Sequence, residues 1–591
     1  MVLPNGLPEM TIKKKKAGRP RKTAAQPQQE AKDEAGHADD TVQFTFDEIM
    51  HFAGQLARNI PTPETYEEAT SDPDYGAQWL DSMKEELNSI KRLGVYEVAT
   101  LPENATLIKT RWVYKVKEDK HGYANRLKSR WVVLGYRQKF GVNYGDVHSP
   151  VSKLATVRTL LAAAASLGLE VHQIDVETAF LNAILEEDIY VMLPPGFEDQ
   201  LKPGQGLKLI KALYGLKQAP RAWNRTLDTY LVNTGLTKSV ADPCVYYKLV
   251  KGLPVAIVVV YVDDIIIFGS NSAAINRVKC SLRKAFKVTD MGRVDHYLGI
   301  NFTYQADGML HLSQTAYIER ILDRFNLADA APAPAPMPSS TSLRQLQADA
   351  DNESVPMAEV PYRAIIGSLL FLSMCTRPDI ALAVTKLARF STNPKLSHWK
   401  AAKTIVRYLK GTKYLGLTFC PSTLKLEAYV DASWADDPKT RRSTTGALLY
   451  LGENLIDWSA KLQPVIAHST AEAEYIAADY ATRKIVWTRY LLEELGLTQQ
   501  EPTIIHEDND ACISIAKGEG SFEASKHIEL RFHYLRDKVM DKTIQFAQIN
   551  TKDQRADLLT KPVSSQRLTE LRGTLIHANQ TPKTDDFTAS D

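Results

Sequence analysis

Two adjacent aspartates, Asp263 and Asp264, lie between two strongly apolar runs of the chain, residues 255–260 and 265–268. Short apolar runs on either side of a polar pair predict a tight β-hairpin with both carboxylates at its tip. Neighbouring carboxylates among apolar groups repel each other, and a hard divalent cation such as Mg²⁺ removes that cost because it takes oxygen ligands. An isolated pair of this kind is otherwise an acidic surface turn, so a metal site requires a further carboxylate nearby.

A third aspartate, Asp175, has the position that such a site requires. It follows the apolar stretch 167–174, which predicts a strand, and an aromatic residue, Phe180, comes five residues later. Carboxylates on adjacent strands can hold two cations about 3.5–4 Å apart, which stabilise the attacking and leaving oxygens of phosphoryl transfer. We call Asp175, Asp263 and Asp264 the first acidic site and predict that all three are catalytic metal ligands.

A second set of carboxylates lies in the last third of the chain. Two of them end predicted strands and two lie on predicted helices, and together we call them the second acidic site: Asp431, Glu474, Asp508 and Asp557. Ser469 and Glu472 fit a capping box, which gives Glu472 a structural role and leaves Glu474 as the better metal ligand. Each acid alone could be a helix cap or a surface charge, but the ordered set predicts a second catalytic site with two cations.

The composition of the 591 residues is that of a globular protein with several domains, 44% hydrophobic and 24% charged. The formal net charge is only +2, although basic residues outnumber acidic ones between residues 109 and 139. The five cysteines form no CxxC pair, which argues against a zinc site or a disulfide framework and for a reducing compartment. We find no signal-peptide core at the N-terminus and no apolar run long enough to span a bilayer.

The motifs resemble the reverse transcriptase–ribonuclease H portion of copia-type LTR retrotransposon polyproteins, over about residues 63–575. Residues 261–264 resemble the YxDD box of reverse transcriptases, and residues 172–182 resemble their first palm motif. Further matching motifs lie at residues 360–370, 375–380, 398–399, 407–411, 442–446 and 526–527. The sequence contains no protease motif, zinc knuckle or integrase triad, so we expect a portion of a longer polyprotein or an element remnant.

The resemblance implies an α+β right-hand polymerase fold with palm, fingers and thumb, followed by an α/β ribonuclease H-like domain. The segments that we expect are a disordered N-terminal segment at 1–60, fingers and palm at 61–327, a Pro/Ala-rich linker at 328–361, a helical thumb or connection at 362–420, a ribonuclease H-like domain at 421–566 and a C-terminal tail at 567–591. The basic cluster at residues 13–22 is a nuclear-import signal, a minor-groove contact or a solvated tail.

The resemblance also implies a function. The implied function is that of an RNA-directed DNA polymerase, a nucleotidyltransferase, that also has ribonuclease H endonuclease activity on RNA/DNA hybrids. The implied partners are an RNA template, a DNA primer and deoxynucleoside triphosphates, and the implied cofactors are two Mg²⁺ or Mn²⁺ ions in each active site. The expected location is intracellular, in cytoplasmic virus-like particles, in the nucleus or in both. The alternative is a silent or repurposed relic that only binds nucleic acid.

The resemblance assigns roles to further residues. Asp175 and Asp263 would bridge the metals while Asp264 supports them, and Phe180 is either a steric gate against ribonucleotides or an ordinary core aromatic. The residues expected to contact nucleotide or template are Lys128, Arg130, Phe180, Gly215, Gln218, Arg221 and Tyr261. Lys128 and Arg130 could equally form a solvated strand edge. The segment 297–300 is a primer grip or a plain turn, and His527 is a proton shuttle or has a hybrid-binding or structural role.

Overall fold

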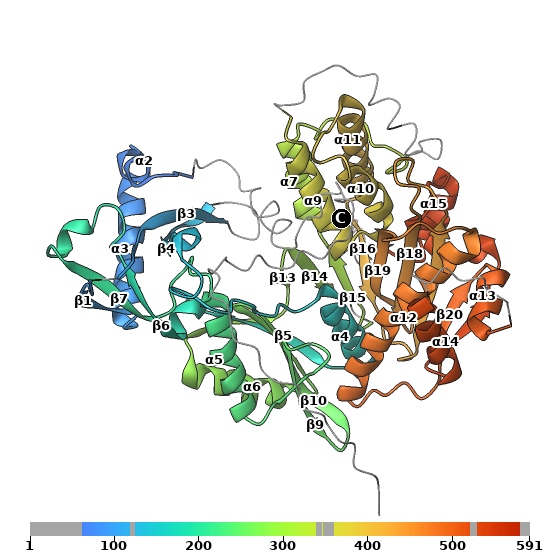
Figure 1. The fold of residues 1–591 in the computed structure, drawn as a ribbon, viewed down its shortest axis with the longest axis horizontal. Coiled ribbons are helices and arrows are strands. Elements are labelled where there is room, and N and C mark those ends of the chain that lie inside the picture. The colour runs from blue at the N-terminus through green and yellow to red at the C-terminus, as the bar shows by residue number, and fades with distance from the viewer. Residues whose placement is uncertain are drawn as a thin grey trace, which may run out of the picture. The chain divides into compact units, whose positions relative to one another are not determined.

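The computed structural model describes residues 62–103, 105–118, 124–305, 307–337, 346, 360–519 and 529–579 (Figure 1). All of these residues belong to one compact unit, Thr41–Asp591. The N-terminal segment 1–60, much of the expected linker 328–361 and His527 lie outside the described residues. Within the described ranges, no helix is both long enough and apolar enough to cross a membrane.

A six-stranded antiparallel sheet carries the first acidic site. Its strands, in spatial order, are β12 (Val288–Arg293), β5 (Glu170–Val176), β11 (Asp264–Gly269), β10 (Leu253–Tyr261), β9 (Val245–Val250) and β8 (Thr237–Lys238). Side chains of β11 alternate between two hydrophobic cores, with Ile265 and Ile267 in one and Ile266 and Phe268 in the other. Because both faces of the sheet are buried at its centre, β10 and β11 are continuously apolar instead of alternating with polar residues. The predicted hairpin is confirmed by the pairing of β10 with β11.

Helices cover both faces of this sheet. The helices α5 (Ala219–Asn233) and α6 (Ser272–Ala285) contribute Trp223 and Leu282 to the core that contains Ile265. The helix α4 (Leu154–Leu167) contributes Leu160 to the core that contains Ile266. The sheet therefore holds the first acidic site on a rigid support between two packed layers.

A separate hairpin carries the basic residues expected in the fingers. The strands β3 (Thr110–Glu118) and β4 (Ala124–Val133) pack against α3 (Gly76–Arg92), which α2 (Tyr66–Ser71) precedes. Trp79 of α3 stacks edge-on against Tyr114 of β3 at 5.1 Å, and the Ser129 N–H donates to Ser82 Oγ at 2.8 Å. A neighbouring four-stranded sheet has the order β1 (Tyr96–Thr100), β7 (Gln205–Lys211), β6 (Ile184–Val191) and β2 (Leu107–Ile108).

The second acidic site lies on a five-stranded sheet near the C-terminal end of the chain. Its order is β19 (Asn454–Leu462), β18 (Thr444–Leu451), β17 (Leu426–Ser433), β20 (Thr503–Glu507) and β21 (Ile544–Gln548). The first three strands are antiparallel, whereas β17, β20 and β21 run parallel. The associated helices are α12 (Thr470–Glu494), α13 (Asp510–Lys517), α14 (Glu529–Met540) and the short 3-10 helix η6 (Arg555–Leu559).

A further sheet joins strands from three of the expected segments, 61–327, 362–420 and 567–591. Its order is β13 (His296–Tyr297), β14 (Ile300–Tyr304), β15 (Leu310–Ser313), β16 (Leu415–Phe419) and β22 (His577–Ala578). The helices α7 (Thr315–Arg324), α9 (Tyr362–Cys375), α10 (Ala381–Ala388) and α11 (Leu396–Gly411) lie between β15 and β16 in the chain. The expected tail therefore differs from the structure, because it contains most of α15 (Ser565–Arg572) and the strand β22.

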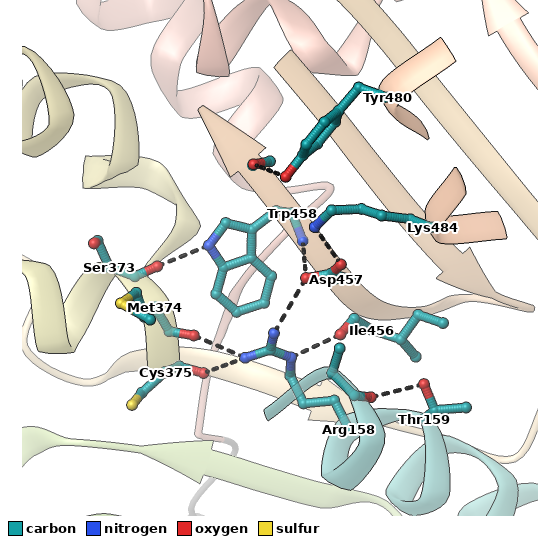
Figure 2. Close-up of polar contacts among 12 residues, drawn as sticks. Arg158, Thr159, Ser373, Met374, Cys375, Ile456, Asp457, Trp458, Tyr480 and Lys484 are labelled. Carbon is teal, nitrogen blue, oxygen red and sulfur yellow. Dashed lines mark hydrogen bonds and ion pairs between the residues drawn. The ribbon is translucent and has the colours of Figure 1, made fainter. Parts of the chain in front are cut away.

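Arg158 joins α4 to two distant parts of the chain. Its side chain donates to the carbonyl oxygens of Ile456 at 2.7 Å and Met374 at 2.8 Å (Figure 2). Its guanidinium also lies 3.5 Å from the carboxylate of Asp457 and 4.0 Å from the ring centroid of Trp458. The six-stranded sheet and the C-terminal five-stranded sheet are thereby linked through a buried charged group.

Two candidate acidic sites

The hairpin β10–β11 places the first two aspartates. Tyr261 and Asp264 are the last paired residues, so Val262 and Asp263 form the turn, and Val262 has the left-handed φ of 56°. The turn is held from both sides, because Trp223 Nε1 donates to the Val262 carbonyl at 2.7 Å and the Val176 N–H donates to the Asp263 carbonyl at 2.9 Å.

The third aspartate lies on the neighbouring strand. Asp175 of β5 is the direct cross-strand partner of Asp264, and directly opposed side chains lie on the same face of a sheet. Gln173 Nε2 donates to Asp264 Oδ1 at 3.0 Å. Sequence reasoning did not single out Gln173, although its position two residues before Asp175 puts it on the same face of β5. The structure thus brings the three predicted acids together.

Aromatic and basic side chains lie beside the first acidic site. Phe180 is half-buried and meets Tyr214 edge-on at 5.6 Å, and the Arg130 guanidinium lies 5.5 Å from the same ring. Burial raises the pKa of Tyr214 to about 12, and the negative charges of Glu86 and Asp263 add to the increase. Asp263 is therefore within electrostatic range of the Tyr214 ring, which both Phe180 and Arg130 contact.

The basic strand β4 also carries Lys128. Burial raises the pKa of Glu86 on α3, while the positive charges of Lys128 and Arg130 act to lower it. Strand alternation puts Lys128 and Arg130 on the face opposite Ser129 and Trp131, which are buried. Lys128 and Arg130, two of the predicted nucleotide or template contacts, are thus neighbours on one face of the hairpin.

The loop before α5 is fastened to this hairpin. Gly215 has a φ of 88°, and a Cβ atom there would lie 2.1 Å from the Val133 carbonyl oxygen. Gln218 is buried, and its Oε1 accepts from Gln138 Nε2 at 3.0 Å while its Nε2 donates to the Asn143 carbonyl at 2.9 Å. Gly215 therefore lies against the protein's own backbone, and Gln218 helps to hold the loop.

Two other predicted contacts remain at the surface or in the sheet. Arg221 is half-exposed and forms an ion pair with Asp146 at 2.9 Å, while Tyr261 ends β10. The segment 297–300 forms a tight hairpin in which Leu298 and Gly299 both have positive φ. The structure is compatible with both the primer grip and the plain turn that the sequence left open.

The four predicted acids of the second site come from four elements. Asp431 lies on β17, Glu474 on α12, Asp508 directly after β20 and Asp557 on η6. Asp431 is 1% exposed, and burial raises its pKa although Lys561 and Thr560 act in the opposite direction. Thr560 Oγ1 donates a hydrogen bond to Asp431 Oδ2.

Glu507 is a fifth acid that the sequence reasoning missed. Its side chain is fully buried, and burial together with Asp508 and Asp431 raises its pKa well above the usual range. Burial also raises the pKa of Glu474, and the charge of Glu507 is the next largest cause. The sequence pattern could have predicted the burial of Glu507, because strand alternation in β20 puts it on the same face as the buried residues Thr503 and Ile505.

Lys561 was missed as well. Its Nζ lies 2.9 Å from Asp431 Oδ1 and 2.8 Å from Asp557 Oδ1. Burial opposes the positive charge of Lys561, but Asp431 and Asp557 outweigh it and raise its pKa. Lys561 follows Asp557 by four residues, which is the spacing of a helical ion pair, and this spacing could have predicted their contact.

The predicted role of Glu472 as a capping residue is confirmed. The Glu472 N–H donates to Ser469 Oγ at 3.2 Å at the start of α12. The Glu472 carboxylate accepts from the His468 N–H at 2.7 Å, one residue before the expected position. Glu472 is thus used to cap the helix, and Glu474 is the glutamate that faces the other acids.

Both acidic sites have the chemistry of cation sites. In the described ranges, no three His, Cys, Asp or Glu side chains are already arranged closely enough to hold a metal ion. Glu474 Oε2 and Glu507 Oε2 are nevertheless buried without a hydrogen-bond partner. Buried carboxylate oxygens left unpaired beside other acids are costly, and a divalent cation would satisfy them. The residues of the second site therefore fit Mg²⁺ or Mn²⁺.

Comparison with known proteins assigns relatives to this chain. Residues 93–339 match the family described as reverse transcriptase (RNA-dependent DNA polymerase). The chain is 40% identical over 503 residues to the retrovirus-related Pol polyprotein from transposon TNT 1-94 of Nicotiana tabacum, which covers 85% of this chain and 38% of the polyprotein. It is 36% identical over 506 residues to the retrovirus-related Pol polyprotein from transposon RE1 of Arabidopsis thaliana. This match covers 82% of this chain and 33% of that polyprotein. The match thus spans 38% and 33% of the lengths of these two polyproteins.

A shorter relative is matched over its whole length. The putative transposon Ty5-1 protein of Saccharomyces cerevisiae is 33% identical over 314 residues, which is 53% of this chain and 100% of that protein. Among solved structures, a foamy viral protease–reverse transcriptase in complex with dsDNA is similar at 14% identity and a TM-score of 0.41, covering 80% of this chain and 83% of that one. LC11-RNase H1 in complex with an RNA/DNA hybrid is similar at 15% identity and a TM-score of 0.19. This match covers 23% of this chain and 94% of that one.

Proposed function

Because this chain belongs to the reverse transcriptase family, as part of a copia-type retrotransposon Pol polyprotein, we propose that it is an RNA-directed DNA polymerase with ribonuclease H activity. The expected fold class agrees with the structure, in which an α+β part over the residues that match the reverse transcriptase family is followed by an α/β part with a mixed five-stranded sheet. The observation that carries the proposal is the cross-strand pairing of Asp175 with Asp264 directly below the Asp263 turn. This arrangement suits a metal-assisted phosphoryl transfer.

In the polymerase reaction, the primer 3′-hydroxyl attacks the α-phosphate of a deoxynucleoside triphosphate and pyrophosphate leaves. Asp175 and Asp263 would hold the divalent cations, which stabilise the negative charge that develops on the phosphate. Asp264 would support them, with its carboxylate oriented by the hydrogen bond from Gln173. The buried sheet keeps these side chains in place before substrate binds, so little reorganisation is needed during the reaction.

The nucleotide would bind beside the Tyr214 ring. Arg130 and Lys128 would contact the triphosphate, and a guanidinium suits this role because it can form paired hydrogen bonds to phosphate oxygens. Phe180 would stand where a ribose 2′-hydroxyl projects. Arg221 and Tyr261 would contact the template or primer strand, while Gly215 and Gln218 would position the loop that leads into α5, the helix that carries Arg221.

The second acidic site would hydrolyse the RNA strand of an RNA/DNA hybrid. Asp431, Glu474, Asp508 and Asp557 would hold two divalent cations, and Glu507 would add a fifth carboxylate. The bound cations would activate water and stabilise the charge on the cleaved phosphodiester. The parallel strands β17 and β20 deliver Asp431 and Asp508 to one edge of the sheet, which supports this role.

The remaining proposals concern partners and location. The partners would be an RNA template, a DNA primer, RNA/DNA hybrids and deoxynucleoside triphosphates. All five cysteines are free thiols, which suits an intracellular location, in cytoplasmic particles or the nucleus. The second candidate function is a relic that only binds nucleic acid, and the presence of every expected carboxylate in both sites favours the enzyme.

Primer extension tests the proposed polymerase. We would incubate the purified chain with a poly(rA) template, an oligo(dT) primer, dTTP and either Mg²⁺ or Mn²⁺. Extension by the wild type and none by Asp263→Asn is the expected result. Equal hybrid binding by both proteins without any extension would support the relic instead.

A further inference from the structure

Lys561 bridges two acids of the second acidic site that come from different elements. Its Nζ lies 2.9 Å from Asp431 Oδ1 on β17 and 2.8 Å from Asp557 Oδ1 on η6. Charge-assisted hydrogen bonds of this length are strong, particularly where the carboxylates are withdrawn from water. The lysine therefore holds β17 and η6 together through their acidic side chains.

The position of Lys561 coincides with two carboxylates that the proposed ribonuclease H function requires as metal ligands. An ammonium and a divalent cation would compete for the same oxygen atoms, Asp431 Oδ1 and Asp557 Oδ1. The two carboxylate side chains are only 1% and 12% exposed, whereas the Lys561 side chain is 43% exposed. The lysine thus reaches the acids from the solvent side and can withdraw by rotating its flexible stem, without movement of the backbone.

We propose that Lys561 is an internal counter-cation of the second acidic site, which binds Asp431 and Asp557 in the metal-free protein and leaves them when a divalent cation binds. The inference rests on the proposed ribonuclease H function, because it requires divalent cations at these carboxylates. It has two consequences. The metal-free domain stays folded despite five neighbouring acids, and the first divalent cation binds more weakly than the acids alone would allow.

A permanent positioning role for Lys561 would have the opposite consequence. A lysine that stayed bound to Asp431 and Asp557 would hold the ligands in the geometry that the metal needs. Its removal would then weaken divalent binding or leave it unchanged. The affinity for a divalent cation therefore separates the two roles, and it can be measured without any enzymatic activity.

Calorimetric titration with Mn²⁺ tests the proposal on the full chain. We would compare the wild type with Lys561→Met and with Lys561→Gln, which keeps a hydrogen-bond donor but not the charge. Lys552→Met is the matched control, because Lys552 is exposed on the short 3-10 helix Thr551–Asp553. Parallel titrations in an Asp431→Asn background measure the Mn²⁺ that binds at the first acidic site, so that it can be subtracted.

The counter-cation role predicts that Lys561→Met binds Mn²⁺ at the second site about tenfold more tightly than the wild type, since two charged hydrogen bonds no longer have to be broken. Lys561→Gln should also bind more tightly, and Lys552→Met should match the wild type. Equal or weaker binding by both Lys561 variants would overturn the proposal. If Asp431→Asn did not change Mn²⁺ binding in the wild type or in any of these variants, both the counter-cation role and the proposed ribonuclease H site would be wrong.

Thermal unfolding gives a second, independent readout. Without a divalent cation, Lys561→Met should have a lower Tm than the wild type because its acids repel each other, and saturating Mn²⁺ should close the difference. A difference that Mn²⁺ leaves unchanged would mean that the lysine is only a structural partner. If Lys561→Met does not fold even with Mn²⁺, the same comparison with Lys561→Gln decides the question.

Discussion

At the residue scale, each acidic site depends on a few side chains that are fixed by neighbours. Gln173 holds Asp264, and Thr560 and Lys561 hold Asp431. The sequence predicted the acids because their spacing after strands is informative. It did not predict their partners, since a glutamine or a lysine near an acid has no distinctive spacing until the strands are paired.

Phe180 allows a direct test of substrate selection at this scale. Its ring meets Tyr214 edge-on, and only part of it is buried. Phe180→Ala should raise the ratio of kcat/KM for ribonucleotides to that for deoxynucleotides by at least about tenfold, because the steric barrier to a 2′-hydroxyl is lost. The ratio is measured by single-nucleotide extension with each substrate. An unchanged ratio accompanied by a lower Tm would make Phe180 an ordinary core aromatic.

At the element scale, the six-stranded sheet is tied to its covering helix α6 by a charged group. Lys279 of α6 is almost fully buried and lies 2.5 Å from Asp290 of β12. Partial burial acts to raise the pKa of Asp290, but hydrogen bonds from Lys279, the Gly292 N–H and Arg283 outweigh it and lower the pKa below its usual range. Asp290 therefore stabilises the folded protein while it is ionised.

This pair predicts a dependence of stability on pH. Because the folded-state pKa of Asp290 lies below that of the unfolded chain, its contribution is present above the unfolded pKa and is lost as the pH falls through the folded pKa. Asp290→Asn should lower the free energy of unfolding by about 1 kcal/mol at neutral pH, and the difference from wild type should shrink in acid. Urea denaturation across a pH series measures this.

The control for this series is Asp199→Asn, which changes an exposed aspartate on the 3-10 helix Glu198–Gln200. The free energy of unfolding of Asp199→Asn should equal that of the wild type at every pH. A difference between the wild type and Asp290→Asn that stayed constant down to strongly acidic pH would show that the Asp290 charge does not contribute.

Element prediction from sequence succeeded where the pattern was local. The hairpin at 253–269, the strand that ends near Asp431 and the cap at Ser469 all follow from short-range rules. The pairing of β16 with β15 and β22 did not follow, because their partners are more than 100 residues apart in the chain. The hydrogen bonds of Gln218 did not follow either, since only the tertiary fold brings Gln138 and Asn143 to its side chain.

At the scale of the whole molecule, one link between the parts that carry the two sheets is a buried junction at Arg158. Arg158→Met would remove the donor to the Ile456 and Met374 carbonyls, and it would leave Asp457 with Lys484 as its remaining ion-pair partner. Breaking a buried charged network typically costs about 3–5 kcal/mol. We expect the thermal transition of this variant to separate into two, as the parts that carry the six-stranded sheet and the C-terminal five-stranded sheet unfold independently.

Calorimetry provides the check on this junction. Arg92→Met, at an exposed position at the end of α3, is the matched control and should keep the transition of the wild type. A single transition for Arg158→Met at an unchanged Tm would mean that the remaining contacts between α4 and β19 hold the parts together without it.

If one chain carries two separate active sites, variants of the two sites assayed in parallel should lose different activities. Primer extension and cleavage of a labelled RNA/DNA hybrid would be measured for Asp263→Asn and Asp431→Asn with Mg²⁺ or Mn²⁺. We predict that Asp263→Asn loses extension by at least about 10²-fold and keeps cleavage, while Asp431→Asn loses cleavage and keeps extension. Two results would rule out separate sites: loss of both activities in one variant, or retention of both activities in both variants.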